Sequence, residues 1–226
     1  MLTDLWDASE WYNALLEGNS ESFDQIKNGY KIHESLFALR LMEVTQCYVL
    51  LLSILRNVQK LETDPTRIFQ LIEKFTFQYS VVCNLPGNRV EKIYTRYALE
   101  IDNACQTAGS KGHSGKIQSI FSKLEKELTD ARPSFAVFQD SFAGFVYKNS
   151  EKSRRLTKYI LAQLDSTLRV TKENRIDFNN VNVEHILPQT PDSAWRLTKK
   201  EIKPYVNKLG NLTLLDKRIQ ERALGG

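Results

Sequence analysis

The spacing of apolar residues is the feature that most limits the fold of this chain. Over residues 32–170, apolar side chains recur at three- and four-residue intervals, which aligns them along one face of a helix. After Val170 the period changes to two in "RIDFNNVNVEHIL" (175–187), and such alternation is typical of a strand. We therefore expect a mainly α protein: a helical domain over residues 1–170, followed by a small module with strands over residues 171–226.

Individual helices follow from the same spacing and from residues that favour helix ends. Residues 32–58 predict one long helix whose second half is buried. The segment "DPTRIFQLIEKFTFQYSVV" (64–82) predicts a helix that begins near Asp64, because Asp favours the N-cap and Pro65 suits the first helical position. Further helical patterns complete the array, at residues 90–108, 116–128, 132–147 and 150–168.

The C-terminal module has the predicted order strand, loop, strand, helix. A second strand is expected in "KLGNLTLL" (208–215), a Leu-rich run that is entered through a glycine. The segment "LDKRIQERAL" (215–224) returns to a helical composition. A module of about 50 residues buries little apolar surface by itself. We therefore expect it to pack against the helices that precede it.

Cysteine usage and hydropathy exclude several classes of protein. Cys47, Cys83 and Cys105 lie far apart and form no CxxC pair, which argues against a zinc site and a disulfide framework and favours a reducing compartment. The longest apolar run, "CYVLLLSIL" (47–55), is too short to span a bilayer. The first sixteen residues lack the basic region of a secretory signal. We therefore expect a cytoplasmic protein without a membrane partner.

Charge is spread unevenly along the chain. Residues 151–226 hold 15 Lys and Arg against 9 Asp and Glu, a balance of +6, whereas residues 1–150 have a balance of −2. A basic segment suits a polyanionic partner such as nucleic acid. On charge alone, a solvated, Lys-rich face is the favoured explanation of an imbalance of this size.

Candidate chemistry centres on "VNVEHILPQT" (181–190), where His185 follows Glu184 at the end of the first predicted strand. A histidine can activate a water, because its unperturbed pKa lies near neutrality. A neighbouring carboxylate can hold a divalent cation that polarises a phosphoryl oxygen. Asn211, in "LGNLTLL" (209–215), can fix a loop or orient the histidine through its amide. A partly buried His–Glu pair without a catalytic role remains the alternative.

The combination of these segments carries a family resemblance. "VEHILPQT" (183–190) followed by "KLGNLTLL" (208–215) closely resembles the HNH-like module at the C-terminus of GmrSD-type restriction proteins, which is a ββα-metal, or His-Me finger, nuclease. The specific match covers residues 181–222, and the helical stretches 72–94 and 156–164 resemble the family more loosely. The resemblance implies a metal-dependent DNA endonuclease of a modification-dependent restriction or phage-defence system in a prokaryotic cytoplasm.

The resemblance also implies roles for single residues. His185 is the general base, Glu184 is a metal ligand for Mg²⁺ or Mn²⁺, and Asn211 supports the loop and the base. The third HNH position falls on Gln220, where the family usually has Asn or His, and the last helix ends early at Gly226. These two departures support a second reading: a non-catalytic helical DNA-binding or interaction module with a degenerate nuclease site.

Asp216 has two possible roles at the start of the final helix. It lies one helical turn before Gln220, so it could compensate as a cation ligand. Its place directly after "LTLL" favours the N-cap of that helix instead.

The implied partners are DNA and a nucleotide-binding half. In the family that half precedes the nuclease region, and this chain shows no counterpart of it, so it would be supplied by a longer protein or by a partner subunit. The candidate DNA-binding residues lie in the basic C-terminal third and comprise Arg154, Arg155, Lys199, Lys200 and Lys203.

Overall fold

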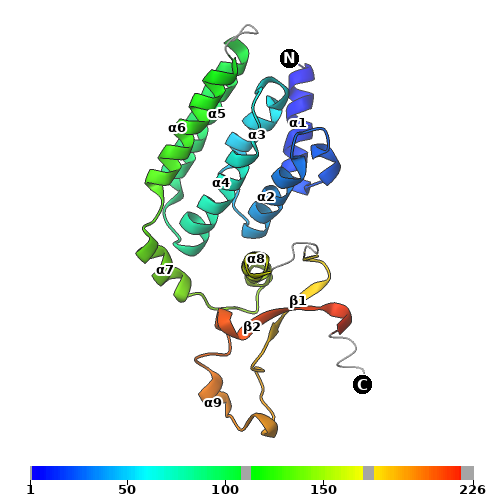
Figure 1. Cartoon of the computed structure of the whole chain (residues 1–226), viewed down its shortest axis with the longest axis vertical. Helices are drawn as coiled ribbons and strands as arrows, with labels where there is room; N and C mark the ends of the chain where they lie inside the picture. Colours follow the sequence, from blue (N-terminus) through cyan, green and yellow to red (C-terminus); the bar gives the residue numbers. More distant parts are fainter. Residues whose placement is uncertain (1, 108–112, 170–175, 220–226) are drawn as a thin grey trace. The chain divides into compact units, whose positions relative to one another are not determined.

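A computed structural model of the chain describes residues 2–107, 113–169 and 176–219 (Figure 1). The described residues are mainly helical, and a two-stranded sheet lies near the C-terminal end. The prediction of a mainly α protein is therefore confirmed. The chain divides into two compact units, Met1–Phe142 and Ala143–Gly226, each of which has its own architecture.

The N-terminal unit is an array of helices, coloured blue to green in Figure 1. Helix α1 packs on α3, α2 on α4, and α3 on α5, while the long helices α5 and α6 lie side by side. The bounds are α1 Leu2–Glu17, α2 Gly29–Met42, α3 Tyr48–Arg56, α4 Thr66–Thr76, α5 Gly87–Thr107, α6 His113–Ala131 and α7 Phe135–Ala143. Short 3₁₀ turns, η1 Ser20–Phe23 and η2 Val58–Lys60, follow α1 and α3. Among the described residues, no helix combines the length and apolar character needed to cross a membrane.

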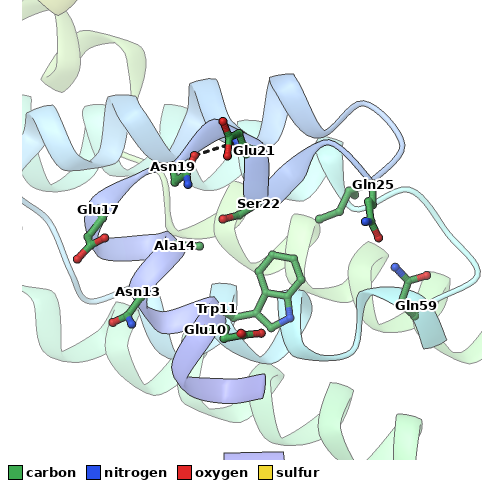
Figure 2. Close-up of a pocket in the computed structure, with 11 residues that line it drawn as sticks. Glu10, Trp11, Asn13, Ala14, Glu17, Asn19, Glu21, Ser22, Gln25 and Gln59 are labelled. Carbon is green, nitrogen blue, oxygen red and sulfur yellow. Dashed lines mark hydrogen bonds between the residues drawn. The ribbon is translucent and has the colours of Figure 1, made fainter. Parts of the chain in front are cut away.

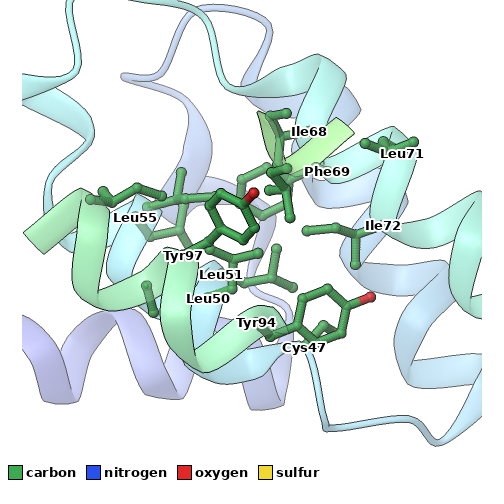
Figure 3. Close-up of a cluster of buried hydrophobic side chains, with 14 of the residues drawn as sticks. Cys47, Leu50, Leu51, Leu55, Ile68, Phe69, Leu71, Ile72, Tyr94 and Tyr97 are labelled. Atoms are coloured by element: carbon green, nitrogen blue, oxygen red, sulfur yellow. The ribbon is translucent and has the colours of Figure 1, made fainter. Parts of the chain in front are cut away.

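The apolar core of this unit takes residues from all the helices α1 to α6, and Figure 3 shows the part contributed by α3, α4 and α5. Leu51 of α3, Phe69 of α4 and Tyr94 of α5 are almost completely buried there. Burying a side chain of this size stabilises the fold by roughly 1.5–3 kcal/mol, so the periodic apolar positions provide most of the stabilisation. Burial also raises the pKa of the Cys47 thiol to about 12, and the side chain acts as a small apolar residue.

The prediction of one long helix over residues 32–58 is wrong. Helix α2 ends at Met42, and Glu43 adopts a left-handed backbone with φ of 57°. A left-handed residue at this position terminates a helix, and α3 begins only at Tyr48. The apolar spacing continues across the break because both helices bury residues in the same core.

The next helix begins close to its predicted start, with Pro65 rather than Asp64 as the N-cap residue. The Asp64 side chain accepts a hydrogen bond of 2.9 Å from the backbone N–H of Thr66, the first residue of α4. After Thr76 the backbone widens into a π-helix, η3 Phe77–Val82. The Phe77 ring there meets the edges of two rings of α7, with centroid separations of 6.3 Å each.

The C-terminal unit combines one long helix with the sheet. Helix α8 (Glu151–Leu168) is capped at its N-terminus by Ser150, whose side chain accepts a hydrogen bond from the backbone N–H of Ser153. Strands β1 (Val181–His185) and β2 (Leu212–Asp216) pair in antiparallel fashion. Both strands contact α8, so the sheet packs on the helix that precedes it, as predicted.

The connection between β1 and β2 is long and carries little regular structure (Figure 1). It holds the 3₁₀ turn η4 (Ser193–Trp195), the short helix α9 (Lys199–Ile202) and the turn η5 (Leu209–Asn211). Residues 217–219 are helical directly after β2. The order strand, loop, strand and helix start is thus present, and the remainder of the predicted final helix lies outside the described residues.

Candidate active site

The strand register fixes how the predicted site residues lie. His185 is the last residue of β1 and pairs with Leu212, while Glu184 pairs with Thr213. Successive side chains of a strand point to opposite faces, so Glu184 and His185 project from opposite faces of the ribbon. On the histidine face Leu212 is buried, whereas Thr213 on the other face is exposed. The Glu184 and His185 side chains can therefore contact the same ligand only if that ligand lies at the end of the strand.

Asn211 ties together the two segments that border the strand ends. Its Oδ1 accepts a hydrogen bond of 2.8 Å from the backbone N–H of Leu187. Its Nδ2 donates to the backbone oxygens of Leu187 at 3.0 Å and Val206 at 2.8 Å. Its own backbone oxygen accepts from Ile186. The chain leaving β1 and the chain entering β2 are thus fixed to one another by a single amide.

The imidazole of His185 contacts three residues that the sequence reasoning missed. Its Nε2 lies 3.1 Å from Oδ1 of Asn207 and 3.3 Å from Nε2 of Gln189. The Tyr147 ring meets it edge-on, with a centroid separation of 5.4 Å and an interplanar angle of 77°. Gln189 lies only four residues after His185, and this short separation was a weak indication in the sequence that the two side chains lie close together. No periodicity links His185 to Asn207 or Tyr147.

A second backbone pairing holds these contacts in place. Val146 forms a bridge with Lys208, and the Tyr147 N–H donates to the Asn207 backbone oxygen at 2.9 Å. The segment before α8 therefore runs beside the segment before β2. This pairing presents the Tyr147 ring and the Asn207 amide to His185 together.

Asp216 caps the helical residues after β2. Its Oδ1 accepts from the backbone N–H of Arg218 at 2.9 Å, and its Oδ2 pairs with the Arg218 guanidinium at 2.8 Å. Hydrogen bonds from the Arg218 side chain and backbone lower the pKa of Asp216 to about 2. The capping role favoured for Asp216 is confirmed.

The proposed metal ligands are only partly described. Gln220 lies outside the described residues. Within the described part of the chain, no three His, Cys, Asp or Glu side chains gather closely enough to hold a metal. Mg²⁺ at phosphate-processing sites is held by one or two carboxylates, substrate phosphate oxygens and waters. Glu184, as one carboxylate at the strand end, fits such a sparse set of donors.

The candidate DNA-binding residues fall into two groups. Lys199, Lys200 and Lys203 are exposed and lie on or directly after α9 in the β1–β2 connection. The nearby Glu201 carboxylate is engaged by Thr198 in a capping box, and these hydrogen bonds lower the pKa of Glu201. The Glu201 carboxylate is thus hydrogen-bonded to Thr198, and the side chains of the three lysines are exposed to solvent.

The second group lies on α8. Arg154 is exposed, and its Nη1 donates to the Asn149 side chain at 2.9 Å. Arg155 is half-buried and forms an ion pair of 3.0 Å with Glu151. An arginine that is already paired gives up part of that interaction to bind a phosphate. We therefore expect Arg154 to contact DNA more strongly than Arg155.

The N-terminal unit contains a pocket of about 480 Å³ beside α1 and η1 (Figure 2). Trp11, Glu10, Glu17 and Glu21 are among the residues that line it, and no Lys or Arg is among its described lining residues. Such a pocket repels a polyanion. The basic candidates for DNA binding all lie in the other unit.

The fold and the His185 cluster define the class of this region: a small helix-and-hairpin module with a histidine at a strand end. Residues 132–219 match the family model described as the C-terminal domain of GmrSD restriction endonucleases. The predicted resemblance is therefore confirmed for this part of the chain, and it indicates a function of the restriction-endonuclease type. The matched stretch includes Glu184, His185, Asn207 and Asn211. Comparisons of the chain with curated proteins and with solved structures gave no match.

Proposed function

We propose that the C-terminal unit is an HNH-type, ββα-metal DNA endonuclease module in which His185 is the general base. The observation that carries this proposal is the placement of His185: it ends β1, and the Asn207 amide and the Tyr147 ring contact its imidazole. The match to a restriction-endonuclease domain over residues 132–219 supports DNA as the substrate.

In this proposal the chain's own residues hold and move the proton. A water attacks the phosphorus of a phosphodiester and gives its proton to the imidazole of His185, while the bond to a sugar oxygen breaks. Asn211 keeps the loop after His185 in place. Glu184 and Gln220 are the proposed ligands of Mg²⁺ or Mn²⁺. When bound, such a cation polarises a phosphoryl oxygen and stabilises the leaving alkoxide.

The proposed substrate is foreign, modified DNA, and the proposed partner is a nucleotide-binding half or subunit of a restriction system. Lys199, Lys200, Lys203 and Arg154 would contact phosphates, because they are exposed cations in the unit that carries His185. These contacts position the duplex without reading its sequence. Binding by this chain alone is therefore expected to be weak and sequence-tolerant.

A plasmid-nicking assay tests the proposed function. We expect the purified chain to convert supercoiled plasmid to the open-circular form slowly in Mg²⁺, faster in Mn²⁺, and not at all in EDTA. Mn²⁺ is expected to be the better cofactor because a given ligand set binds it more tightly. DNA binding without nicking in any of these ions would contradict the nuclease and favour the alternative, a DNA-binding module with a degenerate site.

Salt dependence tests the DNA-binding residues. Each phosphate contact contributes a slope of about −0.9 to log affinity against log salt for duplex DNA. Replacing Lys199, Lys200 and Lys203 together by Gln is expected to make that slope shallower by up to roughly 2.7. Fluorescence anisotropy of a labelled duplex across a salt series measures it.

A matched control for this prediction lies on α6 of the other unit. Lys116, Lys123 and Lys126 are also exposed, so their joint replacement by Gln changes the net charge equally. The slope is expected to stay the same in this control. Equal changes in the two triple variants would show that only net charge matters and that α9 is not the contact surface.

A further inference from the structure

Oδ1 of the Asn207 side chain lies beside Nε2 of the His185 ring. Nε2 of His185 lies 3.1 Å from Oδ1 of Asn207, and Nε2 of Gln189 lies 3.5 Å from the same oxygen. We propose that Asn207 is a positioning residue that fixes the tautomer of His185, with the proton on Nε2 and the lone pair on Nδ1. This inference rests on the proposed role of His185 as the base, and it identifies Nδ1 as the atom that accepts the proton from water.

The hydrogen-bond donors and acceptors of Asn207 and Gln189 around Nε2 of His185 favour this tautomer. An amide oxygen only accepts, and it has two lone pairs. With the proton on Nε2, His185 donates to Oδ1 of Asn207 at 3.1 Å and Gln189 donates to the same oxygen at 3.5 Å, while the 3.3 Å contact between Nε2 of Gln189 and Nε2 of His185 brings two donors together. With the proton on Nδ1, Gln189 could donate to Nε2 of His185 at 3.3 Å, but the Nε2 lone pair would face Oδ1 of Asn207 at the shorter distance of 3.1 Å, where two acceptors repel one another. The first arrangement is therefore favoured.

Asn207 is held on both sides by its backbone neighbours. The backbone oxygen of Asn207 accepts a hydrogen bond of 2.9 Å from the backbone N–H of Tyr147. The next residue, Lys208, forms the β-bridge with Val146, and the backbone oxygen of the preceding residue, Val206, accepts from the Asn211 side chain. The amide is thus presented from a fixed backbone. An acceptor whose position is set in advance costs little ordering entropy when it binds the ring.

The same hydrogen bond gains strength during the proposed reaction. When Nδ1 takes a proton, the ring becomes an imidazolium and its Nε2–H becomes a charged donor. Charge-assisted hydrogen bonds are roughly twice as strong as neutral ones. The bond from the ring to Asn207 is therefore kept throughout the proposed proton transfer.

Nuclear magnetic resonance of the full chain tests the tautomer directly. Long-range ¹H–¹⁵N correlation in alkaline buffer, on protein labelled at histidine, is expected to show Nε2 protonated in the wild type, with the His185 signals assigned by their loss in His185→Ala. Asn207→Ala is expected to give a mixture of tautomers. Asn207→Asp keeps an acceptor at this position and is expected to restore the Nε2–H form. Asn179→Ala, an exposed asparagine of the same unit, is the matched control and should leave the signals unchanged.

The nicking rate supplies a second readout. Asn207→Ala is expected to lower kcat by roughly ten- to a hundredfold, less than the loss expected on removing the base itself, with KM for DNA unchanged. A wild-type ring protonated on Nδ1, or an unchanged tautomer in Asn207→Ala, overturns the inference. Absence of nicking by the wild type would contradict only the proposed function, because the tautomer is measured without DNA.

Discussion

His185→Ala is expected to reduce plasmid nicking by at least about a hundredfold, because general base catalysis contributes roughly 10²–10⁴-fold to rates. The side chain is only half-buried, so its loss should leave the fold intact. Affinity for DNA should remain close to that of the wild type, since the proposed phosphate contacts come from other residues. Nicking in Mn²⁺ measures the rate, and anisotropy measures binding.

His33 provides the matched control for this prediction. It lies in α2 of the N-terminal unit, where its Nε2 is 2.9 Å from the backbone oxygen of Gly18. His33→Gln removes a histidine without altering the proposed site, so nicking should persist. Full activity of His185→Ala, or equal losses in the two variants, would refute the assignment of the base.

Asn211→Ala is expected to have the largest effect on the local stability of the C-terminal unit. The substitution removes three side-chain hydrogen bonds. At about 0.5–1.5 kcal/mol each, their loss should lower the free energy of local opening by roughly 2–4 kcal/mol. Nicking should fall as well, because the loop after His185 would lose its connection to Val206.

Hydrogen exchange measured by mass spectrometry suits this prediction, because a chain with two compact units need not unfold in one step. Peptides that cover residues 186–189 and 206–211 are expected to lose protection. Thr213→Ala changes an exposed residue of the neighbouring strand and serves as the control. Unchanged exchange in Asn211→Ala would show that the amide does not hold the two segments together.

The sequence by itself determined the local conformation of most elements. Apolar spacing predicted the helical segments, and two-residue alternation predicted a strand where β1 (Val181–His185) occurs. A Leu-rich run entered through a glycine predicted the strand β2 (Leu212–Asp216). These patterns are local, since side-chain direction follows the period of the backbone. The segments "VEHILPQT" and "KLGNLTLL" together also indicated the family whose model matches residues 132–219.

Periodicity did not reveal where helices end or which core they join. The break at Glu43 depends on one left-handed residue and leaves the apolar spacing intact. Along the chain, the boundary between the two compact units falls between Phe142 and Ala143, whereas the change of period lies near Val170. Helix α8 (Glu151–Leu168) has the helical period of the N-terminal unit, yet it packs on the C-terminal sheet. A hydrophobic period reports that a face is buried, but not which partner buries it.

The contacts of His185 were decided only by the tertiary structure. The sequence placed Glu184 and His185 side by side, and the strand geometry projects them from opposite faces of the ribbon. Asn207 lies 22 residues after His185 and reaches it because two backbone pairings, β1 with β2 and Val146 with Lys208, bring the segments together. A hydrogen bond between distant side chains leaves no periodic trace in a sequence, because it depends on chain segments that only folding brings together.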